Sequence, residues 1–356
     1  MAQATLSHAS HHNLFLGYLG QPPLFFAGAS FENTHFLHGA DFSNSNFVPD
    51  PMHRSENAPA IFNRVSFSND VFFNRAQFSD KVEFRSAKFF RKASFRAAAF
   101  KDYAAFRSAM FSDHALFRET QFGGFANFAS ANFQSITRFN DAEFQKQVPE
   151  FYGASLFENV IFPFPPDYTK NWPRLSGSGI MPVEQQKRAY NRLRLFMNKS
   201  LQIDEEQFFH RQEMRCKTKL ARWYHKPFYW LYSWFSDYGI SVWRPLFGII
   251  AVMLFGALFM LWWQEAFTFL PKDAAGFDWT LGLLGEDDPW TKPRQAAGWS
   301  ISNTLPFLGF GKLYYGGEFA AKLAWPLKVV GGVQTVFGFV LLFFLGLGLR
   351  NRFRLR

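Results

Sequence analysis

The stretch FNRAQFSDKVEFRSAKFFRKASF, residues 73–95, repeats a pattern that runs without a miss from Phe62 to Phe144. Its phenylalanines are separated alternately by five and six residues, so the repeating unit has eleven residues. The ladder consists of Phe62, Phe67, Phe73, Phe78, Phe84, Phe89, Phe95, Phe100, Phe106, Phe111, Phe117, Phe122, Phe128, Phe133, Phe139 and Phe144. Neither the 3.6-residue period of a helix nor the two-residue alternation of a strand produces this spacing. A short fixed period carrying one large apolar residue predicts a solenoid.

A small or β-branched residue stands two positions before most of these phenylalanines, as at Ala76, Val82 and Ala87. The resulting pattern, AxFxxxAxFxx, resembles the pentapeptide-repeat family in a Phe-rich variant with one extra residue in alternate units. This resemblance implies a right-handed quadrilateral β-helix whose central Phe points inward. The residues themselves support the same arrangement, because polar residues such as those at 79–81 separate the rings. We therefore expect a solenoid core that includes Phe78, Phe84, Phe89, Phe95, Phe100, Phe106, Phe111, Phe117, Phe122, Phe128 and Phe133.

The predicted β-helix covers residues 25–165 and follows an N-terminal segment at 1–24. The ladder begins at Phe25, is interrupted by a Pro-containing loop at 48–61, and ends at the sequence FPFPPDY, because proline cannot donate to further ladder bonds. From residue 20 to residue 165 there are fourteen Lys plus Arg and fourteen Asp plus Glu. Some pentapeptide-repeat proteins imitate acidic duplex DNA and inhibit DNA gyrase, but this neutral solenoid lacks the acidic face. A basic stripe is also missing, so we expect no nucleic-acid partner.

A Pro/Gly/Ser linker at 166–181 is followed by a helical pattern at 182–226, which carries eleven Lys plus Arg and five Asp plus Glu. A basic helix pair beside a membrane commonly faces anionic lipid, and a plain solvated face is the alternative. The next segment, 227–244, is dense in Trp and Tyr, as is typical of a membrane interface.

Two uncharged, mostly apolar runs follow, at 245–264 and 329–349, and each is long enough to span a bilayer. The tail at 350–356 carries four arginines, whereas the segment from 264 to 298 has six acidic and three basic residues. The positive-inside rule therefore predicts a multi-pass protein with both termini in the cytoplasm and an outer loop at 265–298. That loop contains the acidic residues Glu286, Asp287 and Asp288.

A shorter apolar segment at 299–312 is too short to span and is a re-entrant candidate. The order of helix, outer loop, re-entrant segment and helix resembles the two-helix pore domain of tetrameric potassium-type channels. Against the filter pattern T-V-G-Y-G-D stand, in order, Phe307, Leu308, Gly309, Phe310, Gly311 and Lys312. The two glycines match, while Phe307 replaces the threonine and Lys312 replaces the acid. On this resemblance the filter is degenerate.

The whole order of repeats, basic helices and hairpin also resembles a bacterial group, which implies the inner membrane. We expect no enzyme, because no phosphate-binding, nucleophile-elbow, zinc-protease or dinucleotide motif is present. No catalytic residue, metal site or cofactor is predicted. The adjacent Asp287 and Asp288 fit a solvated turn better than catalysis, although they would concentrate cations at an outer mouth.

Two functions remain open from the sequence. In the first, hairpins of a homo-oligomer, a tetramer by the resemblance, form an ion pore that the cytoplasmic β-helix controls or anchors. Glycines Gly331, Gly332 and Gly338 of the second span would allow bending or close packing. In the second, the hairpin anchors a β-helix that binds a cytoplasmic protein partner, without conduction.

Overall fold

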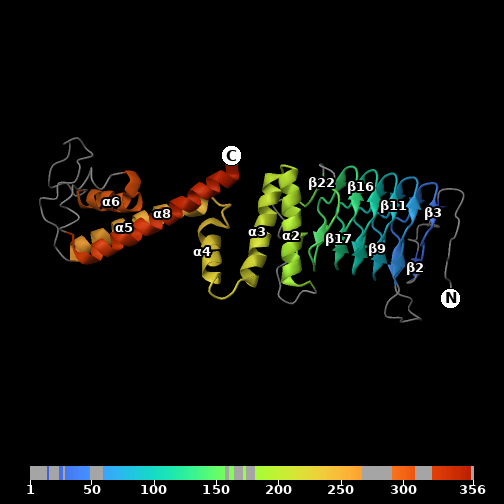
Figure 1. The fold of residues 1–356 in the computed structure, drawn as a ribbon, viewed down its shortest axis with the longest axis horizontal. Coiled ribbons are helices and arrows are strands. Elements are labelled where there is room, and N and C mark those ends of the chain that lie inside the picture. The colour runs from blue at the N-terminus through green and yellow to red at the C-terminus, as the bar shows by residue number, and fades with distance from the viewer. Residues whose placement is uncertain are drawn as a thin grey trace. The chain divides into compact units, whose positions relative to one another are not determined.

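The computed structural model describes residues 14–15, 24–26, 29–48, 59–156, 160–163, 171–173, 181–266, 291–308 and 323–353. The chain divides into two compact units, Met1–Leu220 and Ala221–Arg356. Among the described residues, the first unit contains the β-strands followed by helices, and the second contains only helices. Figure 1 shows the strands of the first unit in successive parallel coils.

The predicted solenoid is confirmed as a parallel β-solenoid with four sheets and Phe-rich stacked repeats. The first sheet contains β1 (Leu14–Phe15), β4 (Ala40–Asp41), β8 (Val71–Phe72), β12 (Ala93–Ser94), β16 (Ala115–Leu116), β20 (Thr137–Arg138) and β22 (Val160–Ile161). The second contains β2 (Leu24–Phe26), β5 (Asn46–Val48), β9 (Gln77–Phe78), β13 (Ala99–Phe100), β17 (Gln121–Phe122) and β21 (Glu143–Phe144). The third contains β6 (Ala60–Ile61), β10 (Val82–Glu83), β14 (Ala104–Ala105) and β18 (Ala126–Asn127). The fourth contains β3 (His35–Phe36), β7 (Ser66–Phe67), β11 (Lys88–Phe89), β15 (Met110–Phe111) and β19 (Asn132–Phe133).

Between residues 60 and 144 two eleven-residue units make one coil, because the strands there pair with partners 22 positions away. Val82 pairs with Ala104, and Ala104 pairs with Ala126. The rings follow the same period: Phe106 stacks on Phe84 and on Phe128, each with centroids 5.0 Å apart. The eleven phenylalanines from Phe78 to Phe133 that the sequence assigned to the core are at most 1% exposed. The alternation of five and six residues therefore builds four ring stacks inside one continuous core.

The coils turn at a left-handed residue that recurs every eleven positions. Arg75, Ser86, Ala97 and Ser108 have φ between 54° and 58°, and each lies two residues after a ladder Phe. A backbone bond from the next amide closes each turn, as from Ala98 N to the Phe95 carbonyl at 3.1 Å. Positive φ at the third residue of a turn normally favours Gly or Asn. At these four positions the backbone hydrogen bonds between coils hold the left-handed conformation instead, as from Ala97 N to the Arg118 carbonyl at 2.8 Å.

Helices α2 (Val183–Lys199) and α3 (Ile203–Leu220) cover the C-terminal end of the solenoid. Trp172 takes the place of the next ring above Phe144, with centroids 5.0 Å apart. Phe209 of α3 then packs edge-on against Trp172 at 5.0 Å. The helix pair is therefore part of the same core as the repeats, and it removes from water the apolar end that a solenoid would otherwise expose.

The second unit contains α4 (Lys226–Ser236), α5 (Trp243–Ala266), α6 (Thr291–Thr304), the 3₁₀ turn η1 (Pro306–Leu308) and α8 (Trp325–Phe353). Helices α5 and α8 are long and apolar enough to cross a membrane, and only 17% and 22% of their apolar windows are buried in the chain. They contain the predicted spans 245–264 and 329–349. Figure 1 shows α5, α6 and α8 packed side by side.

Candidate functional site: the helical unit

The short helix α6 packs against both long helices. Its Ala296 and Trp299 form a buried cluster with Met260 of α5 and Leu327 of α8. Ser300 Oγ donates to the Met253 carbonyl of α5 at 2.6 Å. Helix α6 begins at Thr291, eight residues before the re-entrant segment predicted at 299–312, and ends at Thr304. It is therefore a non-spanning helix fixed to a helical hairpin.

Small residues of α8 set how closely α6 approaches. A Cβ on Gly338 would lie 2.1 Å from the Thr304 carbonyl oxygen, and a Cβ on Gly331 would lie 3.1 Å from Asn303 Nδ2. A Cβ on Gly332 would meet nothing within 4 Å. Of the three glycines singled out from the sequence, two therefore face α6 and one does not. Helix α8 is continuous through all three, so they serve close packing there.

The end of α6 lies about halfway along α8. Gly338, against which Thr304 packs, is the fourteenth residue of the 29-residue helix Trp325–Phe353. At 1.5 Å per residue this position is roughly 20 Å from the start of α8, which is close to the middle of the helix. The last residue of α6 therefore lies beside the middle of α8, a position we call mid-depth of the hairpin.

A buried amide joins the three helices. Gln334 of α8 is 2% exposed. Its Nε2 donates to the Val252 carbonyl of α5 at 3.0 Å and to Ser300 Oγ of α6 at 2.8 Å. Gly256 makes room for it, since a Cβ there would lie 1.8 Å from Nε2. This contact was not predicted, and its one signal in the sequence is the lone glutamine in the run VVGGVQTVFGFVLLFFLGLGL.

The other predicted site residues fall at or beyond the edge of the described chain. Phe307 and Leu308 lie in η1 and are 62% and 42% exposed. Gly309, Phe310, Gly311 and Lys312 lie outside the described residues, as do Glu286, Asp287 and Asp288. Of the segment aligned with the filter pattern, the described residues thus include only Phe307 and Leu308, which follow α6 in the chain.

Helix α4 has two different faces. Tyr232 and Phe235 pack on Phe344 of α8, with ring centroids 5.7 Å and 6.2 Å apart. Trp230 and Trp234, which lie one turn apart on another face, are 76% and 74% exposed. The aromatic segment predicted at 227–244 is therefore part helix, with one face in contact with the hairpin and one face open.

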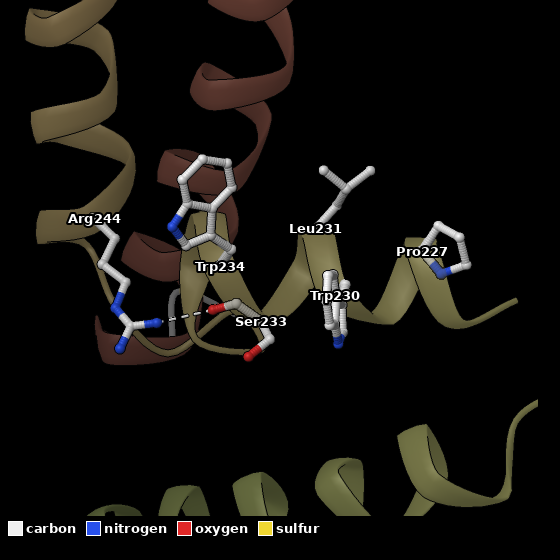
Figure 2. Close-up of a pocket in the computed structure, with 6 residues that line it drawn as sticks. All are labelled: Pro227, Trp230, Leu231, Ser233, Trp234 and Arg244. Atoms are coloured by element: carbon white, nitrogen blue, oxygen red, sulfur yellow. Dashed lines mark hydrogen bonds between the residues drawn. The ribbon is translucent and has the colours of Figure 1, made fainter.

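A pocket of about 690 Å³ lies on the open face of α4. It is lined by Pro227, Trp230, Leu231, Ser233, Trp234 and Arg244, as Figure 2 shows. Arg244, the second residue of α5, donates from Nη1 to the Ser233 carbonyl at 2.9 Å. Asp237 Oδ1 lies 4.0 Å from the same nitrogen. We call this space the α4 pocket.

Within the described residues there is no cluster of three or more His, Cys, Asp or Glu side chains that could hold a metal. In the first unit, burial raises the pKa of the Cys216 thiol to about 11, so the group is a poor nucleophile at neutral pH. Glu213 is buried and pairs with Arg194 at 3.1 Å and Lys217 at 2.7 Å. Burial alone would raise its pKa, but Lys217, Asn191 and Arg194 hold the pKa below its ordinary value. The ion pair between Arg194 of α2 and Glu213 of α3 therefore joins the two helices.

No protein-family model matches this sequence, no curated protein matches it, and no solved structure matches the fold.

Proposed function

We propose that this chain is an integral membrane protein whose α5–α6–α8 hairpin lines an ion pore in a homo-tetramer. The β-solenoid, which we take to be of the right-handed pentapeptide-repeat type, is on the cytoplasmic side and anchors or controls the pore. The eleven-residue repeat with four ring stacks supports the solenoid type. The length and outward apolar character of α5 and α8 support membrane insertion.

The observation that carries the pore proposal is the end of α6 at mid-depth, against Gly338. The last carbonyls of a helix carry a partial negative charge, which favours a cation beyond them. Non-helical backbone at membrane depth is tolerated only where protein buries it or where it lines a water-filled cavity. The backbone that follows α6 would therefore need further copies of the hairpin or water around it, and the exposed side chains of Phe307 and Leu308 are available for contact with another copy.

The hydrogen bonds of the hydroxyl groups in α6 and α8 support the placement of α6 within the bilayer. Thr304 Oγ1 donates to the Ser300 carbonyl at 2.8 Å, and Ser302 Oγ donates to the Gly298 carbonyl at 2.7 Å. Thr335 Oγ1 of α8 donates to the Asn303 carbonyl at 3.0 Å. Hydroxyl groups satisfied in this way can be placed in a bilayer at low cost, whereas unsatisfied ones cannot.

Two residues make the proposed pore a poor conductor. Phe307 places an apolar ring where a threonine would supply an oxygen ligand, which favours dewetting. Lys312 would place a ring of four positive charges near the entrance. Two unit charges about 10 Å apart repel by roughly 0.4 kcal/mol in water and by more where water is partly excluded. Wild-type current is therefore expected to be small and weakly selective.

Planar-bilayer recording tests the proposal. The double variant Phe307→Thr with Lys312→Asp restores both features, and its potassium conductance is expected to exceed that of the wild type. Phe255→Thr, which replaces an exposed ring on α5, is the matched control and is expected to change nothing. Mass measurement in detergent gives the oligomeric state. If all three proteins are tetrameric and stay silent across a wide voltage range, the pore is rejected, and a membrane-anchored scaffold for a cytoplasmic partner becomes the function to test.

A further inference from the structure

The α4 pocket combines an apolar wall with one cationic group. Pro227, Trp230, Leu231 and Trp234 supply the wall, and Arg244 supplies the charge. Its volume of about 690 Å³ falls within the range of small-ligand sites, roughly 300–1,000 Å³. None of the described residues that line it is acidic. The pocket is therefore suited to an amphipathic ligand with a negative group.

Arg244 is oriented for an anion. Its Nη1 is held by the Ser233 carbonyl, and its side chain is half-exposed. A guanidinium presents several donors in a plane and matches phosphate oxygens in pairs, so one intramolecular bond leaves further donors for a ligand. Asp237 at 4.0 Å is too far for a tight ion pair and partly balances the charge. Lys226, the first residue of α4, precedes the lining residue Pro227 in the chain and adds positive charge beside the pocket.

The position of the pocket indicates where its ligand comes from. Arg244 lies at the start of α5, immediately before the apolar run 245–264. The exposed surface continues along α5 through Phe247, whose ring stacks with that of Trp243 at 6.1 Å. If α5 spans the bilayer, the pocket lies at the level of the headgroups, where Trp side chains are enriched. A bilayer lipid can then enter it sideways, along a surface that is already in contact with acyl chains.

We propose that the α4 pocket binds one anionic phospholipid per chain, with the lipid phosphate on Arg244 and an acyl chain along Trp230 and Trp234. This proposal rests on the membrane insertion proposed above. It adds a ligand and a site to that function, because the bound lipid would hold α4 against the bilayer surface. It does not depend on whether the hairpin conducts ions.

The test uses full-length protein reconstituted in phosphatidylcholine vesicles with and without phosphatidylglycerol, then extracted in mild detergent for native mass spectrometry. The wild type is expected to retain about one phosphatidylglycerol per chain in preference to phosphatidylcholine. Arg244→Gln is expected to lower that preference about tenfold, as for the loss of one charge-assisted hydrogen bond. Arg244→Lys, which keeps the charge, should restore part of it. Free glycerol phosphate should not compete, because it lacks the acyl chain.

The variant Trp230→Ala with Trp234→Ala removes two exposed rings, so folding is not expected to suffer, and lipid retention should fall. Arg222→Gln with Trp223→Ala is the matched control, because both residues lie just outside the pocket lining. Equal retention of the two lipids, no effect of Arg244→Gln, or an equal loss in the control overturns the site. Vesicle flotation after an alkaline wash separates the two proposals: a protein that is washed off refutes membrane insertion, whereas a retained protein without lipid preference refutes only the lipid site.

Discussion

At the scale of single residues, each buried phenylalanine is held by rings of the neighbouring coils and of its own coil. Phe106 lies between Phe84 and Phe128, and its ring also meets Phe95 edge-on at 5.4 Å. Stacked and edge-to-face pairs add roughly 0.5–1.5 kcal/mol beyond the burial of apolar area. The stabilising free energy of the folded solenoid is thus distributed over many equivalent ring contacts.

Truncation of one such ring tests this arrangement. Phe106→Ala is expected to destabilise the unit by about 3–5 kcal/mol, because the transfer free energy is lost and a cavity remains. Thermal unfolding of residues 1–220, followed by circular dichroism, should show a melting temperature lower by on the order of 10 °C. Phe90→Ala is the control, since Phe90 follows a ladder ring but points outward and is exposed. A similar shift in both variants would contradict the assigned register.

The thiol of Cys216 provides a second test at this scale. Burial raises its pKa from an ordinary 9.0 to about 11. Since the folded-state pKa is the higher one, its contribution to stability is complete below pH 9 and is lost as pH rises toward 11. At pH 8 a maleimide is expected to modify the folded protein slowly. In a Cys216→Ser background, the exposed substitution Lys101→Cys should react rapidly. Equal rates would show that Cys216 is accessible.

At the scale of elements, glycine contacts fix α6 against α8. Gly338→Ala would push a methyl group into the Thr304 carbonyl, which lies 2.1 Å from the new Cβ position, so α6 must move. Gly332→Ala meets no atom within 4 Å and gains helix propensity, about 1 kcal/mol in a soluble helix. In detergent, the melting temperature of the full-length protein is therefore expected to fall for Gly338→Ala and to stay level or rise for Gly332→Ala. The same sign for both would mean that α6 does not pack there.

The basic residues of helices α2 and α3 partly serve to attach these helices to the solenoid. Arg192 pairs with Glu150 of the solenoid and lies over the Tyr152 ring at 4.2 Å. The amide of Gln202 donates to the Val160 carbonyl at 3.3 Å. The net positive charge of this segment therefore does not translate directly into a free basic face. Part of that positive charge instead binds the α2–α3 helix pair to the last coil of the solenoid.

At the scale of the whole molecule, the proposed membrane insertion predicts the side of the bilayer on which each part lies. Intact cells carrying single cysteines in a Cys216→Ser background can be treated with an impermeant maleimide. Asp287→Cys, in the segment between α5 and α6, is expected to react from outside, because that segment has fewer Lys and Arg for its length than the arginine-rich tail, which stays inside. Lys101→Cys in the solenoid should react only after lysis. Reaction of Lys101→Cys in intact cells would reverse the proposed orientation.

Much of the fold was predictable from local patterns. The eleven-residue spacing identifies the solenoid, because each residue type repeats in the position that the coil geometry requires. The long uncharged runs predict α5 and α8, because helix length must match the thickness of a bilayer. The left-handed turn residues were not predictable, since Arg75 and Ala97 have no intrinsic preference for positive φ and adopt it only under the ladder bonds.

The repeat, its inward rings, the two apolar helices and the short segment between them follow from the sequence alone. These features depend on period, length and composition, which are local properties. Three further features emerge only on folding: Trp172 and α3 close the solenoid, Gln334 joins three helices, and Gly338, but not Gly332, contacts α6. The contact of Arg244 with Ser233 of α4 is a fourth. Those contacts join residues distant in the chain, and their partners are selected by packing geometry that no local pattern contains.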